Sequence, residues 1–155
     1  LENLTFAAPD VGSTNRVREV ASYFNAEMVI CDKHRKRANE IASMVVIGDV
    51  TDRDVVLIDD ICDTGGTLAK SAGLLKEKGA RSVRAFCTHP VLSGNAYSNI
   101  EHSVLEELVV CDTIPLKDKC SKIKVLPTAE LFAVAIRNTF ENKSISSLFV
   151  HSNKK

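Results

Sequence analysis

Residues 59–67 hold the side chains whose types and spacing are best suited to chemistry. They read Asp-Asp-Ile-Cys-Asp-Thr-Gly-Gly-Thr and directly follow an apolar run. The two glycines let backbone N–H groups approach an anion, the hydroxyls of Thr64 and Thr67 can donate to it, and a following helix offers its positive N-terminus. The carboxylates of Asp59 and Asp60 would repel a phosphate, but they suit the cis hydroxyls of a ribose or a bridging magnesium ion. The segment therefore predicts a site for a phosphorylated ribose.

A structural role for the same segment is the alternative. Asp63 or Thr64 could cap the helix while the aspartates form an ordinary turn. For a bare DxxDTG pattern the two explanations would be about equally good. Here the pattern is longer: a strand is followed by paired aspartates, by DTGGT and by a helix. One ligand, a phosphorylated ribose, would require each of these parts, which favours the binding site.

Strand and helix patterns alternate along the chain and indicate how this segment is positioned. Helical periodicity covers residues 15–24, 68–78 and 128–140, and Gly79 stands where a C-cap is expected. This alternation predicts an α/β fold with a mainly parallel, twisted sheet, helices on both faces and residues 55–58 as its buried centre. One face of the last helix is expected to pack on the sheet. The expected strands are residues 4–8, 28–31, 45–47, 55–58, 83–87 and 108–111.

Length and composition limit the chain to one domain. Its 155 residues are 45% hydrophobic with a formal net charge of zero, so we expect a single domain over residues 1–150 and a frayed tail over 151–155. Balanced charge gives no general argument for nucleic-acid or membrane binding. The five cysteines form no CxxC pair, which favours reduced thiols in a cytoplasmic protein. The chain starts without Met and runs at once into an apolar segment, as a fragment cut at a domain boundary would.

Three further features lie at predicted strand ends or between strands. Asp10 follows the first strand and could bind a metal or cap the next helix. The polar run of residues 32–39 is expected to be a mobile loop, and a basic run of this kind is usually just solvated. His89 follows the fifth strand, where a lone histidine is more often a loop hydrogen-bonding residue than a catalyst.

The motif of residues 56–67 resembles the phosphoribosyl motif of type I phosphoribosyltransferase-fold proteins. Further segments resemble the ribose-phosphate pyrophosphokinase family, in order and over nearly the whole chain. Members of that family transfer pyrophosphate from MgATP to the C1 hydroxyl of ribose 5-phosphate, giving phosphoribosyl pyrophosphate and AMP. The resembling segments are residues 8–12, 32–39, 88–94, 111–116 and 144–149.

The resemblance implies a role for each matching residue. Asp59 and Asp60 would hold the ribose hydroxyls, in part through Mg²⁺, and Asp10 would ligate the magnesium carried by ATP. Lys33 and Arg35 would neutralise charge on the transferred group, with Arg35 also contacting ribose 5-phosphate. The residues implied to hold the 5-phosphate are Asp63, Thr64, Gly65, Gly66 and Thr67. Those implied to bind regulatory phosphate or ADP are Ser144, Ser146 and Ser147.

Two positions depart from the family pattern. His34 stands where many relatives carry arginine, at the less critical position of the loop, so the assignment of Lys33 and Arg35 is kept. Ser13 stands where a second glycine is more common, which leaves the geometry of that turn open but keeps the carboxylate of Asp10.

The resemblance also implies that the chain is the C-terminal half of a two-domain enzyme and is inactive alone. The full-length enzyme would be a homo-oligomer, usually a hexamer, with inorganic phosphate as a possible activator. Two alternatives share the motif: a phosphoribosyltransferase of nucleotide salvage, and a non-catalytic regulatory subunit of the synthetase. No hood segment for a nucleobase is evident, which argues against the first, and the presence of Lys33 and Arg35 argues against the second.

Overall fold

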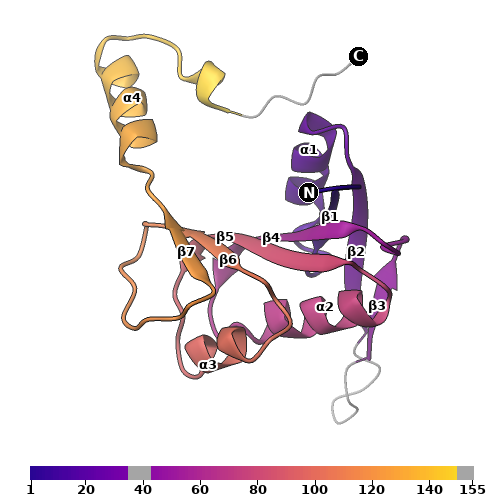
Figure 1. Cartoon of the computed structure of the whole chain (residues 1–155). Coiled ribbons are helices and arrows are strands. Elements are labelled where there is room, and N and C mark those ends of the chain that lie inside the picture. Colours follow the sequence, from indigo (N-terminus) through magenta and orange to yellow (C-terminus); the bar gives the residue numbers. More distant parts are fainter. Residues whose placement is uncertain (35–42, 150–155) are drawn as a thin grey trace.

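The computed structural model describes residues 1–34 and 43–149, which form a seven-stranded sheet with helices on both faces (Figure 1). The strands are β1 (Thr5–Ala8), β2 (Glu27–His34), β3 (Ser43–Ile47), β4 (Asp54–Cys62), β5 (Ser82–Pro90), β6 (Leu108–Cys111) and β7 (Ile123–Leu126). The helices are α1 (Thr14–Tyr23), α2 (Gly66–Glu77), α3 (Ala96–Glu101) and α4 (Ala129–Phe140), followed by a 3-10 turn, η1 (Ser146–Leu148). No described helix is long and apolar enough to cross a membrane.

The strand order β3-β2-β1-β4-β5-β6-β7 places β4 in the middle of the sheet. All neighbouring strands run parallel except β2 and β3, which are antiparallel. Val55 and Leu57 are fully buried and Ile58 is 6% exposed, so the predicted buried centre of the sheet is confirmed. The mainly parallel sheet with helices on both faces is confirmed as well.

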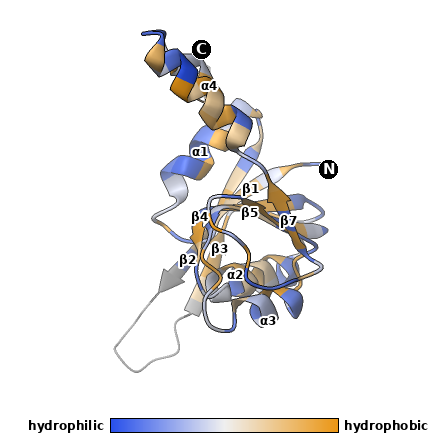
Figure 2. Ribbon diagram, turned by 90° about the vertical axis from the view of Figure 1, so that its left-hand side faces the viewer, coloured by the Kyte–Doolittle hydropathy of each residue, from blue (hydrophilic) through white to orange (hydrophobic). Residues whose placement is uncertain are grey.

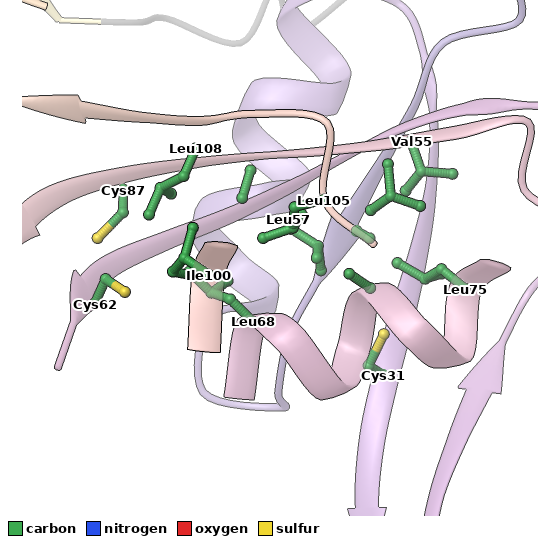
Figure 3. Close-up of a cluster of buried hydrophobic side chains, with 14 of the residues drawn as sticks. Cys31, Val55, Leu57, Cys62, Leu68, Leu75, Cys87, Ile100, Leu105 and Leu108 are labelled. Carbon is green, nitrogen blue, oxygen red and sulfur yellow. The ribbon is translucent and has the colours of Figure 1, made fainter. Parts of the chain in front are cut away.

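Two apolar layers flank the sheet. The larger lies beneath α2 and α3, where Leu57 packs among Leu68, Leu75 and Ile100 (Figure 3). The smaller lies beneath α1 and contains Ile58. Strand residues alternate between the two faces, so Leu57 and Ile58 serve different layers although they are adjacent. All five cysteines are free thiols, and four of them are buried.

Helix α2 begins two residues earlier and ends one residue earlier than its periodicity predicts, because the glycine pair itself opens the helix. Its C-terminus is closed as expected by Gly79, at φ +93°. The N–H of Ala80 donates to the carbonyl of Leu75 and the N–H of Gly79 donates to that of Lys76, both at 3.0 Å. This pair of bonds is the Schellman motif, which satisfies two carbonyls of the last helical turn.

The expectation of a loop from residue 32 onward was wrong for its first three positions. Strand β2 continues through Asp32 and Lys33 to His34, since these residues pair with Val45, Met44 and Ser43 of β3. The antiparallel partner supplies backbone hydrogen bonds, which outweigh the polar character of the side chains. Residues 35–39 of the predicted loop lie outside the described part. Two short elements, α3 and β7, were not predicted.

The expectation that α4 packs on the sheet was also wrong. Its amphipathic pattern does form a helix, but none of its residues is buried. Figure 1 shows α4 standing away from the sheet, and Figure 2 shows that it carries many hydrophobic residues there. Amphipathic spacing identifies an apolar face but not the surface that covers it.

Candidate substrate-binding site

A pocket of about 370 Å³ opens where β1 and β4 end and α2 begins. The carboxyl ends of parallel strands are the usual ligand edge of an open α/β sheet. The pocket therefore lies where the sequence places the site. It brings together most of the predicted residues, and its lining consists of Asp10, Asp59, Asp60, Ile61, Cys62, Asp63, Thr64, Gly65, Thr67 and Leu68.

The aspartate pair meets an arginine that the sequence did not single out. Arg16, in the first turn of α1, donates to the Asp60 carboxylate at 2.8 Å and lies 3.8 Å from the Asp59 carboxylate. The N–H of Asp60 donates to Asp59 Oδ1 at 2.9 Å. The Asp59 side chain is 15% exposed and that of Asp60 is 50% exposed. The carboxylates of Asp59 and Asp60 therefore differ in their exposure to solvent.

These surroundings separate the two carboxyl groups electrostatically. Burial raises the pKa of Asp59 to about 6, and the nearby charges of Asp10 and Asp60 add to the rise. Burial alone would also raise the pKa of Asp60, but its interaction with Asp59 and the Arg16 guanidinium hold that pKa below its usual value. At pH 7 Asp59 is mainly ionised despite its raised pKa, but it is the member of the pair that takes up a proton first as the pH falls.

The glycine-containing loop presents backbone amides at the start of α2. Gly65 has φ +71°, a left-handed conformation that favours glycine. No side chain of the described residues caps α2, so the amides of its first turn are available to an anion. A Cβ on Gly65 would lie 3.3 Å from two carbons of Ile100. Both the backbone conformation and the packing of α3 therefore require glycine at this position.

Residues of the segment after β5 and of α3 form hydrogen bonds to this loop. The backbone N–H of Ser93 donates to the Asp63 carbonyl at 3.0 Å, and its hydroxyl donates to the Asp63 carboxylate. Asn99 of α3 donates from Nδ2 to the Thr64 carbonyl at 2.8 Å. Ser93 thus holds Asp63 Oδ1, while Asp63 still lines the pocket, and its contact with the 5-phosphate stays a prediction.

Asp10 lines the same pocket and also supports the start of α1. Its Oδ1 accepts hydrogen bonds from the backbone N–H of Ser13 at 2.9 Å and from the Ser13 hydroxyl at 3.2 Å. Ser13 is itself the N-cap residue, and α1 has no side-chain cap hydrogen bond, so Asp10 stabilises the turn before α1 and does not cap the helix. These bonds use Oδ1 and leave Oδ2 for a metal, so the two roles are compatible.

The pocket's donor set suits a magnesium ion. Asp10, Asp59 and Asp60 offer hard carboxylate oxygens, and a dication would offset the mutual repulsion that raises the pKa of Asp59. Among the described residues, no three acidic, His or Cys side chains are already grouped to hold a metal. Mg²⁺ commonly takes one or two carboxylates and fills its other positions with water and phosphate oxygens.

The remaining predicted residues lie elsewhere or outside the described part. The backbone of Lys33 lies three residues beyond Ile30, which pairs with Ala8, so Lys33 is at the same sheet edge as Asp10. Arg35 lies outside the described residues. The hydroxyls of Ser144 and Ser146 lie 2.8 Å apart in the exposed segment that contains η1, and Ser147 lies in the same exposed turn. None of the three serines lines the pocket.

His89 forms a hydrogen bond to a residue that follows β6. Its Nδ1 lies 3.0 Å from the Thr113 hydroxyl, which itself donates to the Thr88 carbonyl at 3.0 Å. A hydroxyl that already donates its proton can only accept, so Nδ1 is the donor of this hydrogen bond. His89 lies within β5, not in a loop after it as the sequence suggested, and it does not line the pocket.

Sequence reasoning missed Arg16, Ser93 and Asn99. Arg16 follows Asp10 by six residues, in the first turn of the predicted helix, and this was the available signal for a cation near the acidic pair. Ser93 and Asn99 come from beyond β5, and nothing in the local sequence links them to residues 63–64. A larger hollow of about 520 Å³ lies at the opposite sheet edge, beside Asn25 and Arg53, and contains none of the predicted site residues.

The fold and the site define the class of this chain as a type I phosphoribosyltransferase-fold protein. The crystal structure of phosphoribosylpyrophosphate synthetase from Mycobacterium smegmatis superposes with a TM-score of 0.83 at 33% identity, covering 91% of this chain and 46% of that one. Orotate phosphoribosyltransferase from Aeropyrum pernix, at 17% identity and a TM-score of 0.55, shares the fold.

Residues 12–150 match the model of the phosphoribosyl synthetase-associated domain, and the chain belongs to that family. Ribose-phosphate pyrophosphokinase of Campylobacter jejuni is 52% identical over 149 residues, which are 96% of this chain and 48% of that protein. The enzyme of the same name from Porphyromonas gingivalis is 50% identical over 149 residues, with the same coverage. The resemblance seen in the sequence is confirmed. The chain spans about half the length of the curated relatives it matches.

Proposed function

We propose that this chain is the C-terminal half of a ribose-phosphate pyrophosphokinase and binds its ribose 5-phosphate. The observation that carries the proposal is that one pocket is lined both by Asp59 and Asp60 and by Thr64, Gly65 and Thr67. A sugar phosphate needs carboxylates for its sugar hydroxyls and amides or hydroxyls for its phosphate, at the two ends of one binding site. Relatives about 50% identical that bear this enzyme's name support the same assignment.

In the whole enzyme, pyrophosphate would pass from MgATP to the C1 hydroxyl of ribose 5-phosphate, and AMP would leave. Transfers of this kind depend on positioning and charge neutralisation. The amides of Gly65 and Gly66 with the hydroxyls of Thr64 and Thr67 would fix the 5-phosphate, and Asp59 and Asp60 would fix the ribose hydroxyls. Magnesium, held in part by Asp10, would neutralise charge on the transferred group.

Lys33 and Arg35 are proposed to stabilise the charge that develops on the pyrophosphoryl group. Two cations beside the aspartate edge would complement the acidic pocket at the moment of transfer. A regulatory role for Ser144, Ser146 and Ser147, with inorganic phosphate as activator, and a homo-oligomeric full-length enzyme are further parts of the proposal.

Isothermal titration of this chain with ribose 5-phosphate in the presence of Mg²⁺ tests the site. Thr67→Val should weaken the binding of ribose 5-phosphate and of inorganic phosphate, because it removes a hydrogen-bond donor to the phosphate group. It should leave any binding of free ribose unchanged. Thr139→Val is the matched control, since that hydroxyl binds the Ala135 carbonyl on α4. Equal affinity of the Thr67 and Thr139 variants for ribose 5-phosphate would show that the ligand does not occupy this pocket.

A separate assay tests the claim that the chain is half of an enzyme. Incubated with MgATP and ribose 5-phosphate, the chain alone should release no AMP above the rate without protein. Turnover by the chain alone would refute the claim, whatever the binding experiment shows.

A further inference from the structure

Arg16 occupies a position in α1 that is electrostatically unfavourable for a cation. It lies in the first turn, where the helix dipole is positive, and that turn, all of it described, contains no acidic residue to offset the charge. The offset comes from β4 instead. Arg16 Nη2 lies 2.8 Å from Asp60 Oδ2, and its Nη1 lies 3.8 Å from Asp59 Oδ1. The acidic pair therefore explains why α1 can begin with an arginine.

The same ion pair offsets the crowding of negative charge in the pocket. Asp10, Asp59 and Asp60 all line it, and carboxylates this close disfavour one another's ionised form. Arg16 is not part of the lining, so its guanidinium reaches Asp60 from the α1 side and leaves the cavity open. It therefore acts as a counter-ion to the acidic pair without filling the space that a ligand would take.

The exposure of the ion pair makes it exchangeable. The side chain of Arg16 is 41% exposed and that of Asp60 is 50% exposed. Pairs with this much access to water contribute little to stability, because water competes for both groups. A ligand that needs Asp60 Oδ2 can therefore take it from Arg16, and the released guanidinium can be solvated where it stands. Until then this oxygen is occupied.

Both ligands expected in the pocket compete with Arg16 for the same acceptor. A magnesium ion needs carboxylate oxygens, and ribose hydroxyls need hydrogen-bond acceptors. We propose that Arg16 is a displaceable counter-ion: the first ligand to bind must release it from Asp60, and the second then binds without that cost. Arg16 thereby weakens the binding of either ligand alone and makes the metal and the sugar phosphate bind cooperatively. This inference rests on the proposed function, because it takes ribose 5-phosphate as the sugar ligand.

Titration of the chain with Mn²⁺ at low salt, followed by the EPR signal of the free ion, measures the metal affinity of the empty site. Mn²⁺ takes the same oxygen ligands as Mg²⁺. Arg16→Gln should bind Mn²⁺ about five- to tenfold more tightly, because it removes the repulsion between a unit charge and a dication in a water-exposed site. Arg16→Lys, which keeps the charge but loses the planar fork, should fall between the two.

Arg18→Gln is the matched control for the loss of charge. It removes an arginine from the same helix, but Arg18 donates to Asn15 Oδ1 at 3.1 Å and not to the aspartates. Its Mn²⁺ affinity should therefore stay close to that of the unaltered chain. In an Asp60→Asn background, Arg16→Gln should change Mn²⁺ affinity much less than it does alone, because the partner that Arg16 occupies is gone.

Repeating the titration with saturating ribose 5-phosphate tests the cooperativity. The sugar phosphate should raise the Mn²⁺ affinity of the unaltered chain, and this enhancement should be about five- to tenfold smaller in Arg16→Gln, which has no counter-ion to displace. Equal Mn²⁺ affinities of Arg16→Gln and Arg18→Gln would overturn the inference, and so would an enhancement that Arg16→Gln leaves unchanged. Either result could occur while ribose 5-phosphate still binds. Failure of the proposed function would instead show as no binding of ribose 5-phosphate to the unaltered chain, which removes the cooperativity but leaves the Mn²⁺ titration to decide whether Arg16 is the counter-ion.

Discussion

Replacing Gly65 with alanine is the sharpest test of the phosphate loop. The residue has φ +71°, where a non-glycine residue costs about 1–2 kcal/mol. The added Cβ would lie 3.3 Å from Ile100 Cδ1 and Cγ1 and 3.4 Å from the Ala96 carbonyl oxygen. These contacts require α3 to shift by a few tenths of an ångström. We expect Gly65→Ala to lower the free energy of unfolding by about 1–3 kcal/mol.

The same substitution should cost more free energy of phosphate binding than free energy of unfolding. Either the backbone turns away from φ +71° or α3 moves, and each change redirects the amides at the start of α2. Urea unfolding gives the stability change, and titration with ribose 5-phosphate gives the affinity.

Two other glycines serve as controls. Gly66→Ala is the control for stability and should leave it nearly unchanged, because its Cβ would lie 3.6 Å from the Thr64 hydroxyl oxygen, an ordinary contact. Gly73→Ala is the control for affinity: with no atom within 4 Å of the added Cβ in the middle of α2, it should stabilise by about 0.5–1 kcal/mol and leave the affinity unchanged. The reasoning is refuted if Gly65→Ala matches Gly66→Ala in stability and Gly73→Ala in affinity.

Three further predictions concern ionisable groups. With the pKa of Asp59 raised to about 6, the folded state holds this proton more tightly than the unfolded chain, so stability falls as pH rises from about 4 to 6. Asp59→Asn should therefore stabilise at pH 7 by at most about 3 kcal/mol, should lose that gain below pH 4 in urea titrations, and should weaken ribose 5-phosphate binding. Hydrogen bonds from Arg81, Ser82 and the Glu2 N–H hold the pKa of Asp54 well below its usual value, so its contribution is present above pH 4 and is lost in acid. Asp54→Asn should lower Tm at pH 7 and flatten the acid limb of the Tm profile. Burial raises the pKa of Cys62 to about 11 and of Cys87 to about 12, so Ellman's reagent at pH 8 should label the half-buried Cys120 first and these two only on unfolding.

The central strand and its loop could be predicted because the information is local. An apolar run, two aspartates and a glycine pair are adjacent in the chain, and each has one natural place in a parallel sheet. Gly79 was predictable for the same reason, since a C-cap glycine directly follows the helix that it closes. Asp10 could be placed because it directly follows a strand whose carboxyl end reaches the same edge.

The features that could not be predicted depend on contacts between distant segments. Lys33 lies in a strand only because residues 43–47 return beside it. The direction of α4 is set by Asp112, sixteen residues before Thr128. Arg16 reaches the aspartates only once α1 lies across the sheet in one particular rotation. A single sequence shows that each of these residues is polar or apolar, but not which partner it meets.

Alternation along β4 explains why the two adjacent aspartates differ. Asp60 shares the face of Val56 and Ile58, which α1 covers, and there it meets Arg16. Asp59 shares the opposite face with Leu57, in the layer beneath α2, where burial disfavours its charge. A strand that carries two carboxylates in sequence points them to opposite faces, and Arg16 of α1 lies closer to Asp60, at 2.8 Å, than to Asp59, at 3.8 Å. The pair is therefore not a duplicated ligand: the interaction with Asp59 and the Arg16 guanidinium hold the pKa of Asp60 below its usual value, whereas burial raises the pKa of Asp59 to about 6. This division persists only while β4 remains the central strand, with a helix on each side.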